Sequence, residues 1–250
     1  MKKTGIIILG AVVCLGVAAI CFNGLIKDNS QKKAKENLSE NATEKQVAPT
    51  PTATPTEEEI LAAHHEPEIV AGNGLTLYQN TQEDIPDTFM VPEPVRIDRK
   101  GSNQCYSYCT AMIYRALGDK KADGVKIHKK FEKKYGGGRV NADVISRFIN
   151  ESDKYESTLY TGTIDNLKDC LSKGTPVMFL GRMSIEDPSY HYMTVTGYDE
   201  EKIYIADSYL FEFENEYYNR AVSYDYFSYM WDLELQGYNH VFFEITKKDD

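Results

Sequence analysis

The chain has 250 residues, of which 26% are charged, and a formal net charge of −10. This acidic excess argues against a nucleic-acid partner, because a phosphate-binding surface needs clustered Lys and Arg. The five cysteines do not predict a disulfide framework: two lie in an apolar N-terminal run, which leaves the odd set Cys105, Cys109 and Cys170. The spacing of the histidines, cysteines and carboxylates fits no zinc site, so neither a metal nor a cofactor is expected.

Residues 1–26 are predicted to be an N-terminal transmembrane anchor or signal peptide. Lys2 and Lys3 precede an apolar run from Gly5 to Phe22. A helix of that length spans roughly 27 Å, just enough to cross a hydrocarbon core. We expect a single-pass anchor in the cell membrane. The alternative is a secreted protein, released by signal cleavage near the small residues 17–19.

Residues 27–86 are predicted to be a disordered stalk rich in Pro, Thr and Glu. Pro and Thr alternate between Pro49 and Thr56, and three glutamates follow. Such a stretch has too little apolar surface to bury. A basic tail, an apolar run and a stalk are typical of a domain held off a membrane, so residues 87–250 are expected outside the cell.

Residues 87–250 are predicted to form one domain in which helices precede strands. A short strand broken by prolines is expected from Val91 to Ile97, followed by a helix from an N-cap at Asn103 to Leu117, with Gly118 as its C-terminal cap. Further helices are expected at Val125–Lys134, Ala142–Asn150 and Ile164–Ser172, and strands at Pro176–Leu180, Tyr192–Thr196, Lys202–Ala206 and Val241–Ile245. This order favours an α+β fold with N-terminal helices packed on a C-terminal antiparallel sheet.

Cys105, His191 and Asp207 are the candidate catalytic residues. Cys105 opens the first long helix, where unpaired N–H groups and the helix dipole favour a thiolate. His191 follows a turn and begins a strand, and Asp207 ends the next strand, so the hairpin should return the carboxylate to the imidazole. A thiol, an imidazole and a carboxylate in this order are the parts of a papain-type nucleophilic site. They indicate a cysteine hydrolase or acyl transferase.

The other thiols and imidazoles are weaker candidates. Cys109 lies a full turn inside the same helix, where the dipole effect has faded and the side chain should face the core. Cys170 is expected on a peripheral helix with no role. His64, His65, His128 and His240 lack an evident partner in the sequence.

Four segments carry a family resemblance: Cys105 to Gly118, Leu171 to Val177, His191 to Asp207, and Phe227 to Trp231. Together they resemble papain-like cysteine peptidases related to the double-glycine leader peptidases of bacteriocin export. The run from Cys105 to Gly118 resembles the first helix of that family. Leu171 to Val177 resembles its helix, Gly-x-Pro-Val and strand, and His191 to Asp207 resembles its His, Thr-Gly-Tyr and Asp hairpin. Phe227 to Trp231 resembles its last characteristic element. The resemblance spans about Val91 to Lys247 and implies a papain-like fold and a peptide or protein substrate.

The resemblance also implies roles. Cys105 is the nucleophile, His191 the general base and then acid, and Asp207 the residue that orients the imidazole. The family places an oxyanion-hole Gln about six residues before the Cys, where this chain has Arg99. The candidates for that donor are instead the two amides directly before the nucleophile, Gln104 and Asn103.

Two alternatives remain open from the sequence. One is a peptidoglycan amidase or endopeptidase of the Gln-Cys type, acting on cell-wall peptide, which the pair Gln104-Cys105 and the surface anchor fit. The other is a catalytically silent domain that binds a peptide or a wall polymer through its 18 tyrosines. The preferred hypothesis is an extracellular, membrane-tethered cysteine peptidase.

Overall fold

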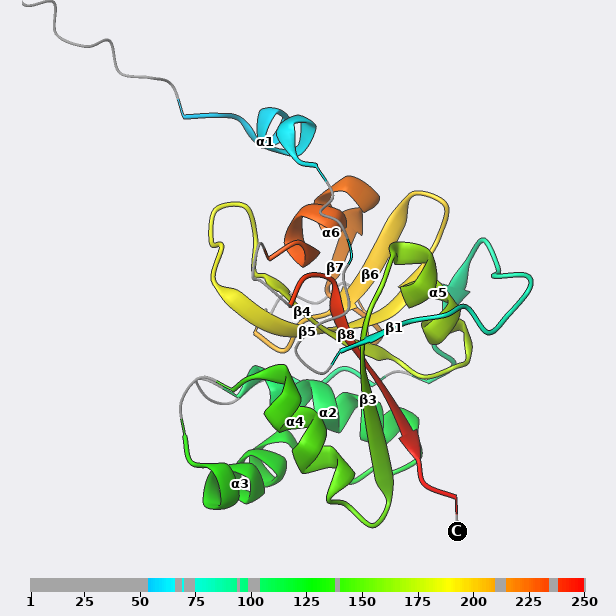
Figure 1. Cartoon of the computed structure of the whole chain (residues 1–250), viewed down its shortest axis with the longest axis vertical. Coiled ribbons are helices and arrows are strands. Elements are labelled where there is room, and N and C mark those ends of the chain that lie inside the picture. Colours follow the sequence, from blue (N-terminus) through cyan, green and yellow to red (C-terminus); the bar gives the residue numbers. More distant parts are fainter. Residues whose placement is uncertain are drawn as a thin grey trace, which may run out of the picture. The chain divides into compact units, whose positions relative to one another are not determined.

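A sheet covered by helices on both faces positions the candidate site (Figure 1). The computed structural model describes residues 54–65, 69, 75–93, 95–98, 104–137, 140–209, 215–233 and 238–249. The expected anchor (1–26) and the first half of the expected stalk lie outside these residues. None of the helices in the described ranges is long and apolar enough to cross a membrane.

The described residues form six helices and eight strands. The helices are α1 Glu57–Ala63, α2 Cys105–Ala116, α3 Gly124–Tyr135, α4 Ala142–Asn150, α5 Ile164–Ser172 and α6 Tyr224–Trp231. The strands are β1 Thr76–Leu77, β2 Phe89–Met90, β3 Tyr155–Thr161, β4 Val177–Arg182, β5 Tyr190–Tyr198, β6 Lys202–Ala206, β7 Arg220–Ser223 and β8 Val241–Lys247. Their order in the sheet is β1-β3-β8-β4-β5-β6-β7, and β2 pairs with β5.

Local sequence signals begin and end the helices. Asp123 caps α3 by accepting the N–H of Lys126, and Thr163 and Asn166 form a reciprocal capping box on α5. Gly118 follows α2 with a φ of 97° and donates its N–H to the carbonyl of Arg115 (2.9 Å), a left-handed helix end that glycine adopts without steric cost. The predicted helices and their ends are therefore confirmed to within one or two residues, except that the N-cap of α2 is Gln104 and the predicted cap Asn103 lies outside the described residues.

The sheet separates two apolar cores. Its strands send alternate side chains to opposite faces: in β4, Met178 and Leu180 join one core, and Val177 and Phe179 the other. Helices α2, α3 and α4 cover the first face, and α5 and α6 cover the second. Helix α2 therefore packs directly on the central strands β4 and β5.

Three features of the sheet differ from the prediction. The strand expected at Val91–Ile97 is wrong: the paired segment is Phe89–Met90, because the following prolines deny the ladder its N–H groups. Strand β3 was not predicted, and it separates α4 from α5, so helices and strands are not segregated in the chain. The sheet is also mixed rather than purely antiparallel, since β1 runs parallel to β3.

Part of the stretch predicted as a stalk belongs to the folded domain. Leu75 and Tyr78 are buried beside β1. The carboxylate of Asp169 on α5 accepts the hydroxyl of Tyr78 (2.6 Å) and the N–H groups of Thr81 (3.1 Å) and Gln82 (2.9 Å). This cluster of bonds fixes residues 78–82 against α5. The domain therefore begins before residue 87.

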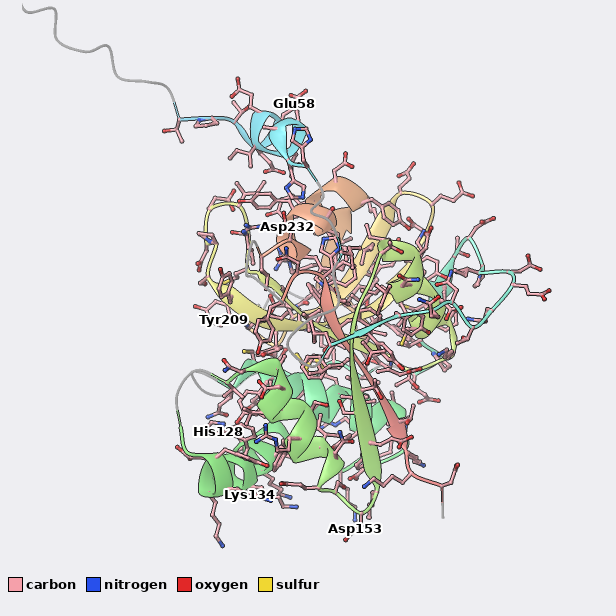
Figure 2. The ribbon with its side chains drawn as sticks, in the orientation of Figure 1. Glu58, His128, Lys134, Asp153, Tyr209 and Asp232 are labelled. Atoms are coloured by element: carbon pink, nitrogen blue, oxygen red, sulfur yellow. The ribbon has the colours of Figure 1, made fainter. Side chains whose placement is uncertain are left out.

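Helix α1 also lies in the predicted stalk. Thr56 and Glu59 form a capping box at its start. His64, just after the helix, places Nδ1 3.8 Å from Oδ2 of Asp232 and its ring edge-on to Tyr229 of α6. In Figure 2, Glu58 and Asp232 lie at the same end of the view as α6, and Lys134 and Asp153 lie at the opposite end.

Candidate active site

The N-terminus of α2 and the β5–β6 hairpin bring Cys105, His191 and Asp207 together. Cys105 is the first residue of α2. His191 is the second residue of β5, and Asp207 directly follows β6. The two strands are antiparallel and pair Thr194 with Ala206, so the chain that leaves β6 runs back past His191. The three side chains predicted as catalytic therefore share one location.

His191 and Asp207 form a buried ion pair. Nε2 of His191 lies 2.8 Å from Oδ1 of Asp207, and the two side chains are 4% and 0% exposed. Because Nε2 is occupied by the carboxylate, Nδ1 is the ring nitrogen left for the thiol. Burial lowers the pKa of His191, but its hydrogen bonds to Asp207 and Cys105 outweigh this and raise the pKa to about 9. Burial raises the pKa of Asp207, but the hydrogen bond and charge of His191 hold it below its ordinary value.

Cys105 meets an environment that favours its thiolate. Burial raises the pKa of its thiol, but the hydrogen bond and charge of His191, with backbone hydrogen bonds from Tyr192 and Tyr106, lower it below its ordinary value. The first N–H groups of α2 are unpaired within the helix and add positive potential at this point. A thiolate–imidazolium pair supplies both a nucleophile and a proton donor, which is what cleavage of an acyl bond needs.

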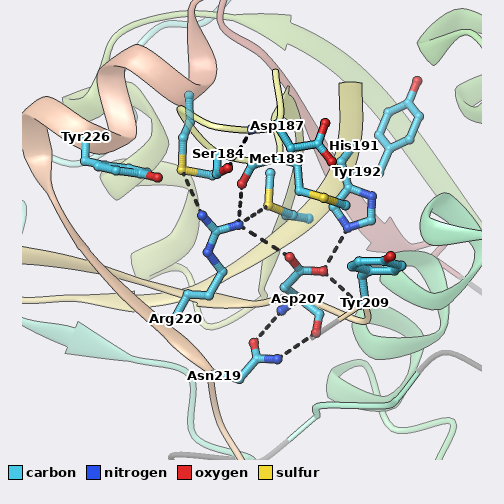
Figure 3. A network of polar contacts seen from close by, with 12 residues as sticks. Met183, Ser184, Asp187, His191, Tyr192, Asp207, Tyr209, Asn219, Arg220 and Tyr226 are labelled. Atoms are coloured by element: carbon cyan, nitrogen blue, oxygen red, sulfur yellow. Dashed lines mark hydrogen bonds and ion pairs between the residues drawn. The ribbon is translucent and has the colours of Figure 1, made fainter. Parts of the chain in front are cut away.

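Two further residues, beyond the three predicted as catalytic, hold Asp207 in place, and the sequence patterns did not identify them (Figure 3). Asn219 accepts the backbone N–H of Asp207 and donates to its carbonyl, both at 2.8 Å. Arg220, the first residue of β7, places Nη1 3.4 Å from Oδ2 of Asp207. The sequence offered one general signal only: a buried carboxylate needs partners for both oxygens. It did not say which residues supply them.

Two exposed tyrosines flank the pair and were also not singled out by the sequence. Tyr190 precedes His191 and is 47% exposed; its hydroxyl donates to the carbonyl of Leu233 (3.3 Å). Tyr209 is 43% exposed, donates its N–H to Oδ1 of Asp207 (2.8 Å), and sets its ring edge-on to that of His191 at 6.2 Å. Figure 3 shows Tyr209 beside the imidazole of His191. The exposed ring of Tyr209 therefore lies next to the imidazole.

The remaining thiols have different surroundings. Cys109 is fully buried and donates to the carbonyl of Tyr192 (3.3 Å), and burial raises its pKa well above the ordinary value. Burial likewise raises the pKa of Cys170, which lies on α5 at 3% exposure. All three described cysteines are free thiols. Cys105 alone among them has a lowered pKa.

The other histidines make structural contacts. His128 lies 2.9 Å from the hydroxyl of Tyr106 through Nδ1. His240 stacks on Trp231 at 4.7 Å and places Nδ1 3.2 Å from the carbonyl of Gly162. Among the described residues, no group of three or more His, Cys, Asp and Glu side chains is arranged to hold a metal ion.

The candidates for the oxyanion hole fall at the edge of the described structure. Gln104 is the N-cap of α2, and its side-chain Oε1 is buried without a hydrogen-bond partner among the described residues. Its backbone carbonyl accepts the N–H groups of Ser107 (3.0 Å) and Tyr108 (3.2 Å). Asn103 and Arg99 lie outside the described residues. The structure thus places one candidate amide directly beside Cys105.

Residues 77–232 contain all three side chains of this site. This stretch, more than half of the chain, matches the Peptidase_C39 like family. No relative was found among curated proteins.

Solved structures with similar folds include a C39-like peptidase from Bacillus anthracis, at 13% identity and a TM-score of 0.49, covering 66% of this chain and 99% of that one. A double glycine motif protease from an AMS/PCAT transporter, solved with its leader peptide, is 14% identical with a TM-score of 0.43, covering 64% of this chain and 94% of that one. Xylellain, a cysteine protease from Xylella fastidiosa, is 13% identical with a TM-score of 0.43, covering 72% of this chain and 94% of that one.

The family match confirms the resemblance read from the sequence and, with it, the enzyme class and the fold class. It spans the strand and helix segments that carry the site, from β1 to the end of α6. The chain belongs to the Peptidase_C39 like family and is a cysteine peptidase of the papain-like fold.

Proposed function

We propose that Cys105, His191 and Asp207 form the catalytic triad of this peptidase. The observation that carries the proposal is the buried line of contacts: Asp207 Oδ1 to His191 Nε2 at 2.8 Å, and His191 to the Cys105 thiol by a hydrogen bond. Each group lies where its role needs it, with the thiol at a helix N-terminus and the carboxylate behind the imidazole.

The reaction follows from these positions. The Cys105 thiolate attacks the carbonyl carbon of the scissile peptide bond, and the carbonyl π electrons move to oxygen. When the carbonyl re-forms, the C–N bond breaks and His191 gives its proton to the leaving amine. Water then attacks the thioester while His191 takes a proton from it, which releases the carboxylic acid and restores the thiolate. Asp207 keeps the ring orientation through both steps.

The oxyanion needs two donors during these steps. We propose the backbone N–H of Cys105, unpaired because it opens α2, and the side-chain amide of Gln104. The burial of the Gln104 side-chain oxygen supports this, because it shows that the amide at the start of α2 is withdrawn from solvent. Asn103 is the alternative donor.

The substrates of this proposal are peptides or exposed protein segments with apolar side chains next to the scissile bond. Tyr190 and Tyr209 support it: they are two of the three exposed large apolar side chains among the described residues, Tyr209 sets its ring edge-on to that of His191, and Tyr190 precedes His191 in β5. The third, Leu77, lies on β1. An apolar side chain that packs on these rings would remove them from water.

The test compares peptides with cell wall. Full-length protein and its Cys105→Ala variant are incubated with short unstructured peptides and with purified cell wall, and products are identified by mass spectrometry. We expect new peptide termini from the peptides, in the wild type only. Digestion of wall without cleavage of peptides would replace the proposal with the amidase alternative. Binding without any cleavage, in both proteins, would support a silent binding domain.

We further propose that the domain acts outside the cell, tethered by residues 1–26. The support is the order of Lys2 and Lys3, the apolar run from Gly5 to Phe22, and the Pro/Thr stretch. Protease treatment of intact cells should release a fragment that begins between residues 27 and 56, while a cytoplasmic marker stays intact. A domain protected until the cells are lysed would overturn this location.

A further inference from the structure

We propose that Arg220 is a positioning residue of the active site: its guanidinium balances the charge of Asp207 and so allows Cys105 and His191 to exist as an ion pair. This inference rests on the proposed triad. Arg220 is a fourth charged residue of the site, and it lies on β7, which carries none of the three proposed triad residues.

The two oxygens of Asp207 have separate tasks. Oδ1 accepts His191 Nε2 and the N–H of Tyr209, both at 2.8 Å. Oδ2 faces Nη1 of Arg220 at 3.4 Å. The carboxylate is fully buried. Arg220 is therefore a cationic partner of the oxygen that the imidazole does not use.

Arg220 is itself held in a fixed place. Nη1 donates to the carbonyl of Met183 at 2.8 Å and lies 3.5 Å from the sulfur of Met193. Nη2 lies 3.5 Å from the sulfur of Met230. The side chain is 12% exposed. Figure 3 shows the guanidinium between these groups and Asp207. Its contacts come from β5, from α6 and from the segments that directly follow β4 and β6, so the guanidinium is held in one position within the site.

The charges explain what this position does. A thiolate, an imidazolium and a carboxylate carry a net charge of −1, and all three side chains are largely withdrawn from water. The guanidinium brings the sum to zero, which reduces the cost of burying the ionised groups. Without it, the thiolate is the group that can most easily give up its charge, because Asp207 keeps its hydrogen bond to His191. Loss of Arg220 should therefore favour the neutral thiol.

Other charged or titratable groups face this cluster but do not replace Arg220. Asp187 and Glu186, in the connection between β4 and β5, are exposed carboxylates that act on His191 and Arg220. Both are negative, and water screens them. Tyr226 of α6 acts on Arg220, and the buried thiol of Cys109 acts on Asp207. Both are neutral near pH 7. None of these four groups supplies a positive charge. Arg220 is therefore the cation that offsets the negative charge on the second oxygen of Asp207.

The test measures how fast iodoacetamide alkylates Cys105 across pH, with the modified residue mapped by mass spectrometry. Arg220→Met removes the charge while keeping an unbranched side chain beside Met193 and Met230. Arg220→Gln removes the charge but keeps an N–H donor for Met183. Arg220→Lys keeps the charge. The control, Arg147→Gln, removes the same charge from the exposed face of α4, where Arg147 pairs with Asp143.

We expect Arg220→Met and Arg220→Gln to slow alkylation about tenfold on the acid side of the profile, because its midpoint moves to higher pH. Arg220→Lys should keep most of the wild-type rate, and Arg147→Gln all of it. If either neutral variant folds, as judged by its thermal melt, and keeps the wild-type midpoint, Arg220 is merely structural and the inference is overturned. If neither folds, a wild-type midpoint in a folded Arg220→Lys supports the charge role, and a shifted one overturns it. A wild type that shows no low-pH alkylation of Cys105 would instead refute the proposed triad.

Discussion

Cys105 and Cys109 lie one turn apart on α2, yet their surroundings move their pKa values in opposite directions. Cys105 gains a hydrogen bond and a positive charge from His191, which lower its pKa despite burial. Cys109 is enclosed by the core and donates a hydrogen bond to the carbonyl of Tyr192; burial dominates and raises its pKa. One helical turn therefore separates a thiol whose pKa is lowered from one whose pKa is raised.

This difference predicts the pattern of thiol labelling. Cys105→Ala should abolish alkylation by iodoacetamide at pH 6, whereas Cys109→Ala should leave the rate within about twofold of the wild type, because only the first carries thiolate there. Peptide mapping after a short exposure checks this. Cys170→Ala, which removes another buried thiol, is the matched control. Loss of labelling in Cys109→Ala alone would move the nucleophile by one turn.

The paired shifts predict a bell-shaped pH profile. The pKa of Cys105 is lowered, so the thiolate and the rate appear as pH rises through that value. The pKa of His191 is raised to about 9, so the imidazolium that protonates the leaving amine is lost as pH rises past it. Turnover of a peptide measured from pH 4 to 11 should therefore reach a plateau near neutral pH and fall near pH 9. A rate that keeps rising above pH 10 would contradict the ion pair.

Asp207 should matter for turnover more than for folding. Asp207→Asn retains the shape but removes the charge behind His191, so kcat should fall by about 10²–10⁴-fold, and His191→Ala should lower it further. Steady-state kinetics and a thermal melt separate the two effects. Asp225→Asn, an exposed carboxylate on α6, should change neither. Equal activity of Asp207→Asn and wild type would remove the carboxylate from the mechanism.

The exposed tyrosines predict a substrate preference. Tyr209→Ala and Tyr190→Ala should raise KM about fivefold for peptides with apolar residues beside the cleaved bond and have little effect on charged ones, since each ring would contribute about 1 kcal/mol of contact. Leu77→Ala is the control, because Leu77 is similarly exposed (44%) but lies on β1. The alkylation rate of Cys105 should stay unchanged in all three. If Leu77→Ala raises KM equally, the tyrosines are not a subsite.

The hydrogen bonds of the Asp169 carboxylate predict an effect on folding stability, at a position outside the candidate active site. It accepts bonds from Tyr78, Thr81 and Gln82, and these bonds hold its pKa below the ordinary value despite burial. Asp169→Asn would leave donors unpaired and should lower the free energy of unfolding by on the order of 3 kcal/mol. Urea unfolding at pH 7 measures this, with exposed Asp165→Asn on the same helix as the control.

The pH dependence of the stability that Asp169 contributes follows from the direction in which folding shifts its pKa. A lowered pKa in the folded state means that the stabilisation is complete above the unfolded pKa of Asp, about 4. It is lost as pH falls through the lower, folded value. Wild-type and Asp169→Asn proteins should therefore converge in stability below pH 4. A difference that stays constant down to pH 2 would assign the effect to packing and not to the charge.

Local patterns in the sequence were enough for helices α2 to α5 and for most of the central strands, whereas α1 and α6 were not predicted as helices. Periodic apolar residues and capping side chains such as Thr163 act within a few residues, so they can be read directly from the chain. The same holds for the hairpin that carries His191, because its turn at Asp199 is closed by local bonds to Glu201 and Lys202. Short-range signals of this kind are sufficient to locate the three side chains of the proposed triad.

Only the tertiary structure decided what surrounds them. Strand β3 is stabilised by pairing with β8, more than 80 residues later in the chain, and no local pattern encodes that partner. Arg220 and Asn219 reach Asp207 because β7 pairs with β6, and Tyr78 reaches Asp169 across 91 residues. The sequence determined the chemistry of the groups and the elements that bear them. Long-range strand pairing and burial decided which charged groups meet, as Arg220 and Asp207 do. Both arise only when the whole sheet is formed.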